Sequence, residues 1–205
     1  MDKRALFITF EGADGCGKTT QVELVKKYLE EKNIKSITTL EPGGCDIGVE
    51  LRQILLHHKG YVADMAELLM YLADRSQHVE TVILKNIKNN TTVLCDRYID
   101  STVAYQGYAR GLDIENIEKL NSIATKGLLP DITFLLDVDT EIAQTRVGKN
   151  KDRMEKEGII FHQKVRNGYL ELAKKNNKRI KVINANLSIE EVFSQIKEIL
   201  DKYYV

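Results

Sequence analysis

The residues best suited to chemistry lie near the N-terminus, in a glycine-rich segment that ends in a lysine and two threonines. Gly12-Ala13-Asp14-Gly15-Cys16-Gly17-Lys18-Thr19 matches the pattern G-x-x-x-x-G-K-[ST] and is followed by Thr20. Such glycines let successive backbone N–H groups point into one concavity that binds phosphate. We predict that Lys18 reaches the β- and γ-phosphates of a nucleotide and that the Thr19 hydroxyl binds Mg²⁺. We expect the Cys16 thiol to be a small tolerated side chain in this loop and not a nucleophile.

A second candidate group is a carboxylate that follows a short apolar run. Thr92-Val93-Leu94-Cys95 leads directly into Asp96 and Arg97. In an α/β sheet this order delivers the acid to the edge where ligands bind, so Asp96 is predicted to hold Mg²⁺ through water. Arg97 is predicted to grip phosphate, and the alternative is a local ion pair with Asp96 or Asp100.

These groups need a scaffold that brings the phosphate loop and the acid together. Apolar or β-branched runs recur at residues 6–10, 37–40, 92–95, 132–137 and 180–184. Segments of helical periodicity separate them, which predicts strands covered on both faces. We therefore expect an α/β fold of three layers, α/β/α, around a central parallel five-stranded sheet. No linker or repeat divides residues 1–205, so we expect one domain, with a basic lid segment at about 146–158.

The overall charge limits the classes of partner. Thirty Lys and Arg balance thirty Asp and Glu in 205 residues. A formal net charge of zero gives no general attraction to nucleic acid or to an anionic membrane, so we expect neither as a partner. The three cysteines form no metal-binding or disulfide pattern, which favours a reducing compartment. The six mostly apolar residues before Glu11 are too few for a signal peptide or a membrane span, and we expect a cytoplasmic protein.

A phosphate loop alone leaves three classes open: a small-molecule kinase, a GTPase switch, and an assembly or motor ATPase. The nearest match to the guanine-reading pattern N-K-x-D is Asn150-Lys151-Asp152-Arg153, which lacks the spacer residue. The signature of ABC-type ATPases is absent, and the chain is short for a motor domain. A kinase with a second, anionic substrate is the reading we favour, and a nucleotide-dependent regulatory or assembly protein remains the alternative from another class.

Several further motifs carry a resemblance to a known family. They are Phe10-Glu11-Gly12, Glu41-Pro42-Gly43-Gly44, Asp96-Arg97-Tyr98, Ala104-Tyr105-Gln106-Gly107 and Pro130-Asp131. In this order, from Phe7 to about Ala185, the chain resembles the bacterial thymidylate kinases. The resemblance implies a P-loop nucleoside monophosphate kinase fold, and transfer of the γ-phosphoryl group of ATP to dTMP with Mg²⁺. A kinase of the same fold that accepts dUMP or another nucleotide is the alternative.

The resemblance also implies an acceptor site. Its implied dTMP-binding residues are Asp14, Glu41, Arg52, Tyr71, Arg75, Arg97, Thr102, Tyr105 and Gln106. Arg52 and Arg97 would hold the acceptor phosphate, and Asp14 the sugar 3′-hydroxyl. Tyr71 would stack on thymine, although it could also be an ordinary residue at the edge of the core. Arg75 would donate to thymine O4, with Thr102 and Gln106 completing the base edge, and Tyr105 would exclude a ribose hydroxyl. Asp74 does not share a helix face with Arg75, so we expect Arg75 to stay free for ligand.

The stretch 146–181 is strongly basic, and either a solvated helix face or a lid explains such a run. In part of the family a lid arginine contacts the transferring phosphoryl group, and Arg153 matches that pattern here because Gly15 stands at the alternative position in the phosphate loop. The implied catalytic set is Lys18, Asp96, Arg97 and Arg153, with no general base. Arg146 would pack on adenine beside Asn184. We thus expect a strongly positive cleft, and a homodimer formed through a long helix at residues 64–89.

Overall fold

A parallel β-sheet forms the centre of the molecule in the computed structural model, which describes residues 4–148 and 152–204. The strands are β1 (Phe7–Glu11), β2 (Ser36–Leu40), β3 (Thr92–Asp96), β4 (Ile132–Asp137) and β5 (Ile180–Asn184). They run in the order β2-β3-β1-β4-β5. Apolar and β-branched side chains dominate β1, β3 and β4, and these three strands are buried because both faces of the sheet are covered. The predicted parallel five-stranded α/β fold is confirmed.

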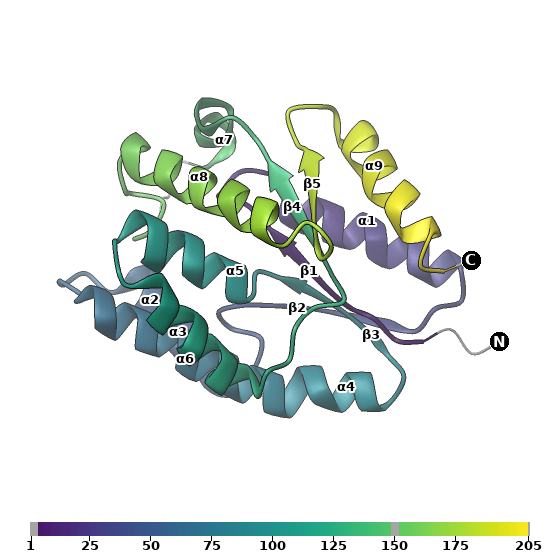
Figure 1. Cartoon of the computed structure of the whole chain (residues 1–205), viewed down its shortest axis with the longest axis horizontal. Coiled ribbons are helices and arrows are strands. Elements are labelled where there is room, and N and C mark those ends of the chain that lie inside the picture. The colour runs from purple at the N-terminus through teal and green to yellow at the C-terminus, as the bar shows by residue number, and fades with distance from the viewer. Residues whose placement is uncertain (1–3, 149–151, 205) are drawn as a thin grey trace.

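Helices cover the sheet on both faces (Figure 1). They are α1 (Lys18–Glu31), α2 (Asp46–His57), α3 (Asp64–His78), α4 (Leu84–Lys88), α5 (Ile99–Thr102), α6 (Ile114–Thr125), α7 (Thr140–Arg146), α8 (Ile159–Lys175) and α9 (Ile189–Asp201), with π-helical segments η1 (Val79–Ile83) and η2 (Val103–Ala109). The helix expected at 64–89 is the continuous run of α3, η1 and α4. None of the helices within the described ranges combines the length and the hydropathy needed to cross a membrane.

Two apolar layers hold the helices onto the sheet. On one face, α1 and α9 place apolar side chains such as Val25 and Ile196 against Ile8 and Phe134 of the central strands. On the other face, α3, η2, α6 and α8 pack around Leu135. The cysteines at 16, 45 and 95 are free thiols, as predicted.

The sheet register aligns the carboxyl ends of three neighbouring strands. Asp96, the last residue of β3, lies beside Phe10 of β1 and Leu40 of β2. The loops that follow β1, β2 and β3 therefore leave the sheet at one edge. In open parallel sheets this edge is where ligands bind.

Candidate active site

The loop between β1 and α1 has a backbone that glycine alone adopts readily. Gly12, Gly15 and Gly17 have positive φ values of 143°, 79° and 94°. A Cβ atom on Gly15 would also lie 2.2 Å from the backbone oxygen of Ala143 on α7. The loop geometry thus depends on both the backbone conformation and the close approach of α7.

Lys18, the first residue of α1, turns back over this loop. Its Nζ donates to the backbone oxygens of Gly12 and Ala13, each at 3.1 Å. Cys16 Sγ lies 3.6 Å from the same Nζ. Burial nevertheless raises the pKa of the Cys16 thiol above its ordinary value. The thiol therefore stays protonated at neutral pH, in agreement with its expected lack of nucleophilic character.

Thr19 and Asp96 bring two hard oxygen atoms together at the end of the loop. Thr19 Oγ1 donates to Asp96 Oδ2 at 3.2 Å, and the threonine is exposed to the cleft. Within the described residues no group of three or more His, Cys, Asp or Glu side chains is arranged to hold a metal ion. A cation at Thr19 and Asp96 would therefore draw its other ligands from phosphate and water, the usual coordination of Mg²⁺ beside nucleotides.

Arg97 follows β3 in a left-handed conformation, with φ of 70°, and its guanidinium lies under the phosphate loop. It is hydrogen-bonded and ion-paired to Asp14, and Tyr105 OH donates to the other oxygen of that carboxylate at 2.9 Å. Burial disfavours the Asp14 carboxylate, but the charges of Arg97 and Lys18 outweigh this effect and lower its pKa to about 2. The alternative pairing of Arg97 with Asp96 or Asp100 is wrong.

A buried polar layer that the sequence did not indicate holds Arg97 from behind. Arg97 Nη1 donates to Ser101 Oγ and to Tyr169 OH at 3.3 and 3.2 Å. Both hydroxyls donate in turn to Glu11 Oε2. Burial, with the nearby charge of Asp100, raises the pKa of Glu11 to about 7. Ser101 lies on α5, four residues after Arg97, and this proximity in sequence could have indicated it, whereas nothing in the sequence marks Tyr169.

The loop after β2 is clamped by side chains of α3. Asp74 Oδ1 accepts a hydrogen bond from the backbone N–H of Gly43 at 3.0 Å. The carbonyl of the preceding Pro42 accepts from Arg52 Nη1 at 2.6 Å. Asp74 is buried, and burial, together with the charge of Glu41, raises the pKa of its carboxyl to about 6. The clamp sets the position of Pro42, and Pro42 sets the position of the Arg52 guanidinium.

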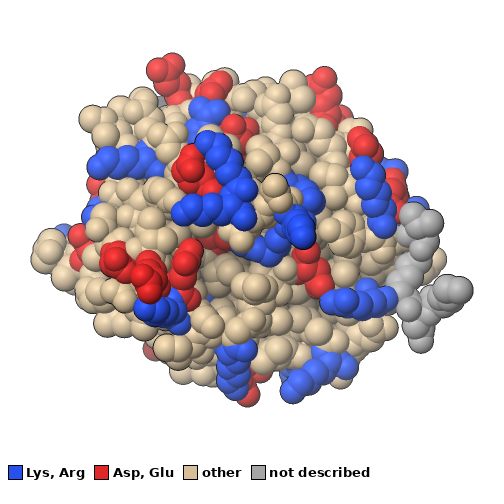
Figure 2. All heavy atoms as spheres, viewed as in Figure 1, with Lys and Arg blue, Asp and Glu red and all other residues tan. Residues whose placement is uncertain are grey.

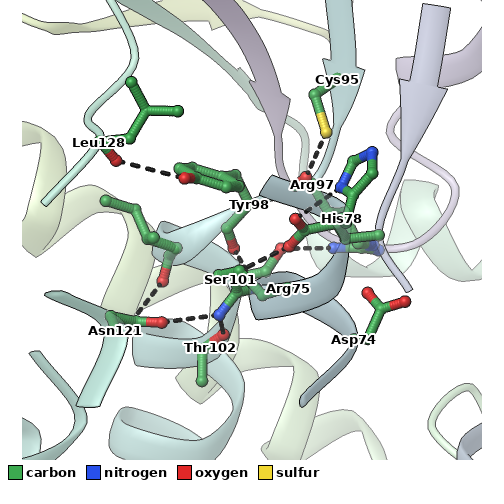
Figure 3. Close-up of polar contacts among 12 residues, drawn as sticks. Asp74, Arg75, His78, Cys95, Arg97, Tyr98, Ser101, Thr102, Asn121 and Leu128 are labelled. Carbon is green, nitrogen blue, oxygen red and sulfur yellow. Dashed lines mark hydrogen bonds and ion pairs between the residues drawn. The ribbon is translucent and has the colours of Figure 1, made fainter. Parts of the chain in front are cut away.

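Arg75 is buried and donates four of its five N–H groups to the protein, which corrects the expectation that it stays free (Figure 3). Its Nε donates to Glu41 Oε2 at 2.7 Å, while Nη1 donates to Thr102 Oγ1 at 2.5 Å and to Asn121 at 2.7 Å. Its Nη2 donates to the Tyr98 carbonyl at 3.0 Å. The physical reason is that a buried guanidinium needs a counter-charge, and Glu41 of the neighbouring loop supplies it in place of Asp74.

Two cavities open at this edge of the sheet, and they meet. The nucleoside pocket is lined by all nine residues of the expected acceptor site together with Pro42, Leu56, Ser101, Asp152 and Met154. The phosphate cleft runs along residues 14–20 and reaches Asp96, Arg146, Ala185 and residues 187–189. Asp14, Glu41, Arg52, Arg97 and Asp152 line both cavities. A group bound in one cavity therefore faces a group bound in the other across two arginines.

Comparison with known proteins gives the family. The family profile described as thymidylate kinase matches residues 10–196. The chain belongs to the thymidylate kinase family. A thymidylate kinase of Carboxydothermus hydrogenoformans is 46% identical over 200 residues, covering 97% of this chain and 98% of that relative. One of Nostoc punctiforme is 48% identical over 198 residues, covering 94% of each. The crystal structure of thymidylate kinase from Ehrlichia chaffeensis matches with a TM-score of 0.82 and 36% identity, over 96% of this chain and 99% of that one. The resemblance is confirmed.

Within this thymidylate kinase fold, Arg153 does not lie where a phosphate-contacting lid arginine would. It lines neither cavity. Its Nη1 is ion-paired with Glu67 Oε2 at 2.6 Å, and its Nε donates to the Leu55 carbonyl at 2.8 Å. Its Nη2 is buried without a hydrogen-bond partner among the described residues. Arg153 is expected from the sequence to contact the transferring phosphoryl group, and in this structure its charge is instead paired with the buried Glu67 carboxylate. Residues 149–151 of the expected lid lie outside the described residues.

Of the residues expected to border adenine, only some line the phosphate cleft. Arg146 Nη1 donates to the Ala185 carbonyl at 3.1 Å, and both residues line the phosphate cleft. Asn184 does not line it, because its Oδ1 accepts from the backbone and side-chain N–H groups of Asn186 and closes the turn. Elsewhere in the basic stretch, Arg166 pairs with Asp137 and Asp139, and Arg179 with Asp100. Figure 2 shows Lys and Arg interspersed with Asp and Glu on the face that carries α8, as a solvated helix face predicts.

Proposed function

We propose that this chain transfers the γ-phosphoryl group of ATP to dTMP, giving dTDP and ADP. The observation that carries the proposal is the junction of the two cavities at Asp14, Arg52 and Arg97. An oxygen of the dTMP phosphate bonds to the γ-phosphorus as the bond from that phosphorus to the β–γ bridging oxygen breaks. The acceptor oxygen is already anionic at neutral pH, so the reaction needs positioning and charge neutralisation and no general base.

On the donor side, Lys18 exchanges its two carbonyl partners for β- and γ-phosphate oxygens when ATP binds. Thr19 and Asp96 fit Mg²⁺, since they offer two oxygen ligands at the end of the loop. The metal supplies neutralisation of the charge shared by the β- and γ-phosphates. Arg146 and the chain at residues 185–189 border the adenine.

On the acceptor side, Arg52 and Arg97 neutralise the dTMP phosphate as it approaches the ATP phosphates. Asp14, with its pKa of about 2, is ionised at any physiological pH and accepts from the 3′-hydroxyl. Tyr105 lies against the sugar, Tyr71 stacks on the base, and Gln106 completes the base edge. The one Nη2 hydrogen of Arg75 that no described residue accepts is the donor available for thymine O4.

Steady-state rates with dTMP, dUMP, dCMP and GMP at matched concentrations, measured by coupled ADP release, test the proposal. We expect the highest kcat/KM with dTMP. A preference for a purine nucleotide overturns the assignment, and a preference for dUMP establishes the alternative kinase. Slow ATP hydrolysis without transfer to any nucleotide would instead indicate a regulatory ATPase, in which the acceptor residues have no purpose.

We further propose that the chain forms a homodimer through α2 and α3. These helices pack together and leave Ile54, Met65 and Leu69 about half exposed, at 46%, 48% and 50%. Ala66 and Ala73 on the same exposed side of α3 allow close approach of a second helix. Sedimentation of the wild type and of Leu69→Glu tests the interface, and a wild type that sediments as a monomer refutes it. A reaction that consumes ATP and dTMP is consistent with cytoplasmic residence and requires neither nucleic acid nor membrane.

A further inference from the structure

Glu67 is a buried carboxylate beside the nucleoside pocket. It lies on α3, one helical turn before Tyr71, and is fully shielded from solvent. Its Oε1 accepts from Gln106 Nε2 at 2.8 Å, and its Oε2 is ion-paired with Arg153 at 2.6 Å. Arg110 donates to both oxygens at 3.4 Å. Every contact of the carboxylate is therefore with a donor.

The Glu67 contact decides which way the side-chain amide of Gln106 is turned. A carboxylate that pairs with arginines offers only acceptors, so the amide must present its NH₂ group to Glu67 and its oxygen to the opposite side. Gln106 lines the nucleoside pocket. Its Oε1 has no hydrogen-bond partner among the described residues. This oxygen is also accessible to solvent, unlike the unpartnered polar atoms that are fully buried. The amide thus offers an acceptor to whatever fills the pocket.

We propose that Glu67 is a positioning residue that determines base specificity through Gln106. With its amide oxygen turned to the pocket, Gln106 accepts a hydrogen bond from a base whose N3 carries a hydrogen, as in thymine and uracil. Cytosine has a bare acceptor at N3, which would face the amide oxygen with no hydrogen between them. The inference rests on the proposed function and adds the residue that sets the polarity of the base contact.

The ion pair with the Glu67 carboxylate places Arg153 beside the nucleoside pocket, on the dTMP side of the site. The backbone N–H of Arg153 donates to the Leu56 carbonyl at 3.0 Å, and the next residue, Met154, lines the nucleoside pocket. Arg153 and Arg110 supply the charge that a buried carboxylate requires, and Arg110 is itself paired with Glu157 at 2.6 Å. Arg153 therefore acts on recognition of the base, by fixing Glu67, and not on the transferring phosphoryl group.

Glu67→Gln tests the proposal because an amide at this position can also donate, which allows the amide of Gln106 to turn over. We expect the ratio of kcat/KM for dTMP over dCMP to fall at least tenfold, since sites built around a polar pair discriminate strongly by that pair. KM for ATP should change less than twofold. A loss of both activities with an unchanged ratio overturns the proposal. If the wild type does not phosphorylate dTMP, the proposed function fails first, and the two failures are thereby distinguished.

Arg153→Met keeps the apolar stem, removes the charge and leaves Glu67 in place, so it tests the same pairing in a milder way. We expect KM for dTMP to rise about tenfold, with kcat within threefold and the dTMP/dCMP ratio reduced. A fall in kcat of about 10³-fold with unchanged KM for dTMP overturns the proposal and assigns Arg153 to the phosphoryl group. Arg166→Met is the matched control, because it removes an arginine of α8 that pairs with Asp137 and Asp139. Thermal melts establish that each variant is folded.

Discussion

The hydrogen bond from Gly43 to Asp74 carries a quantitative prediction about the acceptor site. Asp74→Ala removes the acceptor that fixes the backbone after Pro42, whose carbonyl holds Arg52. The Arg52 guanidinium then loses its fixed position beside the junction of the two cavities. We expect KM for dTMP to rise about tenfold while kcat and KM for ATP change less than twofold.

The magnitude follows from the strength of this hydrogen bond and from what remains after its loss. A hydrogen bond to a charged group contributes roughly 1.5–3 kcal/mol. Burial and the charge of Glu41 raise the pKa of Asp74 to about 6, which shows that its carboxylate is not fully stabilised by this contact. Glu41 also stays anchored by Arg75 and His78, at 2.7 and 2.9 Å. The lower end of that range applies, about 1.5 kcal/mol, which corresponds to roughly tenfold.

Steady-state kinetics with one substrate varied at saturating levels of the other give the required separation of KM values. Asp74→Asn retains an oxygen acceptor for Gly43, so its KM for dTMP should lie within twofold of the wild type. Gly48→Ala provides an independent route, because its Cβ would lie 2.1 Å from Asp74 Oδ1 and would displace that side chain. An unchanged KM for dTMP in Asp74→Ala, or equal increases for both substrates, refutes the reasoning.

Three further changes test other parts of the site. The pKa of Glu11 rises from 4.5 to about 7 on folding, so the stability contributed by its protonated form is complete below pH 4.5 and is lost as the pH rises through 7. Glu11→Gln should therefore flatten the decline in unfolding free energy over this range by on the order of 1 kcal/mol per pH unit, and parallel urea-melt profiles would contradict this. Gly15→Ala should lower stability by about 1–3 kcal/mol and weaken ATP binding, because its Cβ would overlap the Ala143 carbonyl, 2.2 Å away; an unaltered melting temperature and ATP affinity would show that the loop yields. Asp96→Ala should lower kcat about 10–100-fold and raise the Mg²⁺ concentration needed for half-maximal rate, and an unaltered Mg²⁺ titration would remove Asp96 from the metal site.

The fold could be predicted from the sequence because β1, β3 and β4 are runs of apolar or β-branched residues between polar segments, and β2 and β5 keep part of that pattern. The strand expected at 92–95 is observed as Thr92–Asp96, and that expected at 132–137 is observed unchanged as Ile132–Asp137. Burial on both faces of the sheet favours such residues. The pattern can therefore be recognised in the sequence without knowing which strands lie side by side. The cavities were also predictable, since residues at the carboxyl ends of parallel strands must meet at one edge.

The ionic pairings could not be predicted in this way. Arg75 pairs with Glu41, 34 residues earlier, because α3 packs against the loop that follows β2. Arg153 pairs with Glu67 because its part of the chain lies against α2 and α3. A sequence motif gives residue types and their spacing. It does not show which acidic side chain the fold brings next to a given arginine. One signal was present in the sequence, because the ionisable residues Glu67, Asp74, Arg75 and His78 occupy core-facing positions and interrupt the apolar stripe of α3. Charges at such positions are buried, and buried charges have partners.

These ion pairs show how the charges of a protein with zero formal net charge are arranged around a site for two polyanions. The sequence predicts a strongly positive cleft, but Arg97, Arg75 and Arg153 are each matched by a carboxylate. Such pairs add little net attraction, and their value lies in fixing donors and acceptors around the nucleoside pocket before a ligand arrives. By contrast, Lys18, Arg52 and Arg146 donate to backbone carbonyls, and no acid within the described residues pairs with them. All three line the phosphate cleft, so the uncompensated positive charge lies where phosphates accumulate. Of the paired arginines, Arg75 lines only the nucleoside pocket, Arg97 lies at the junction of the two cavities, and Arg153 lines neither.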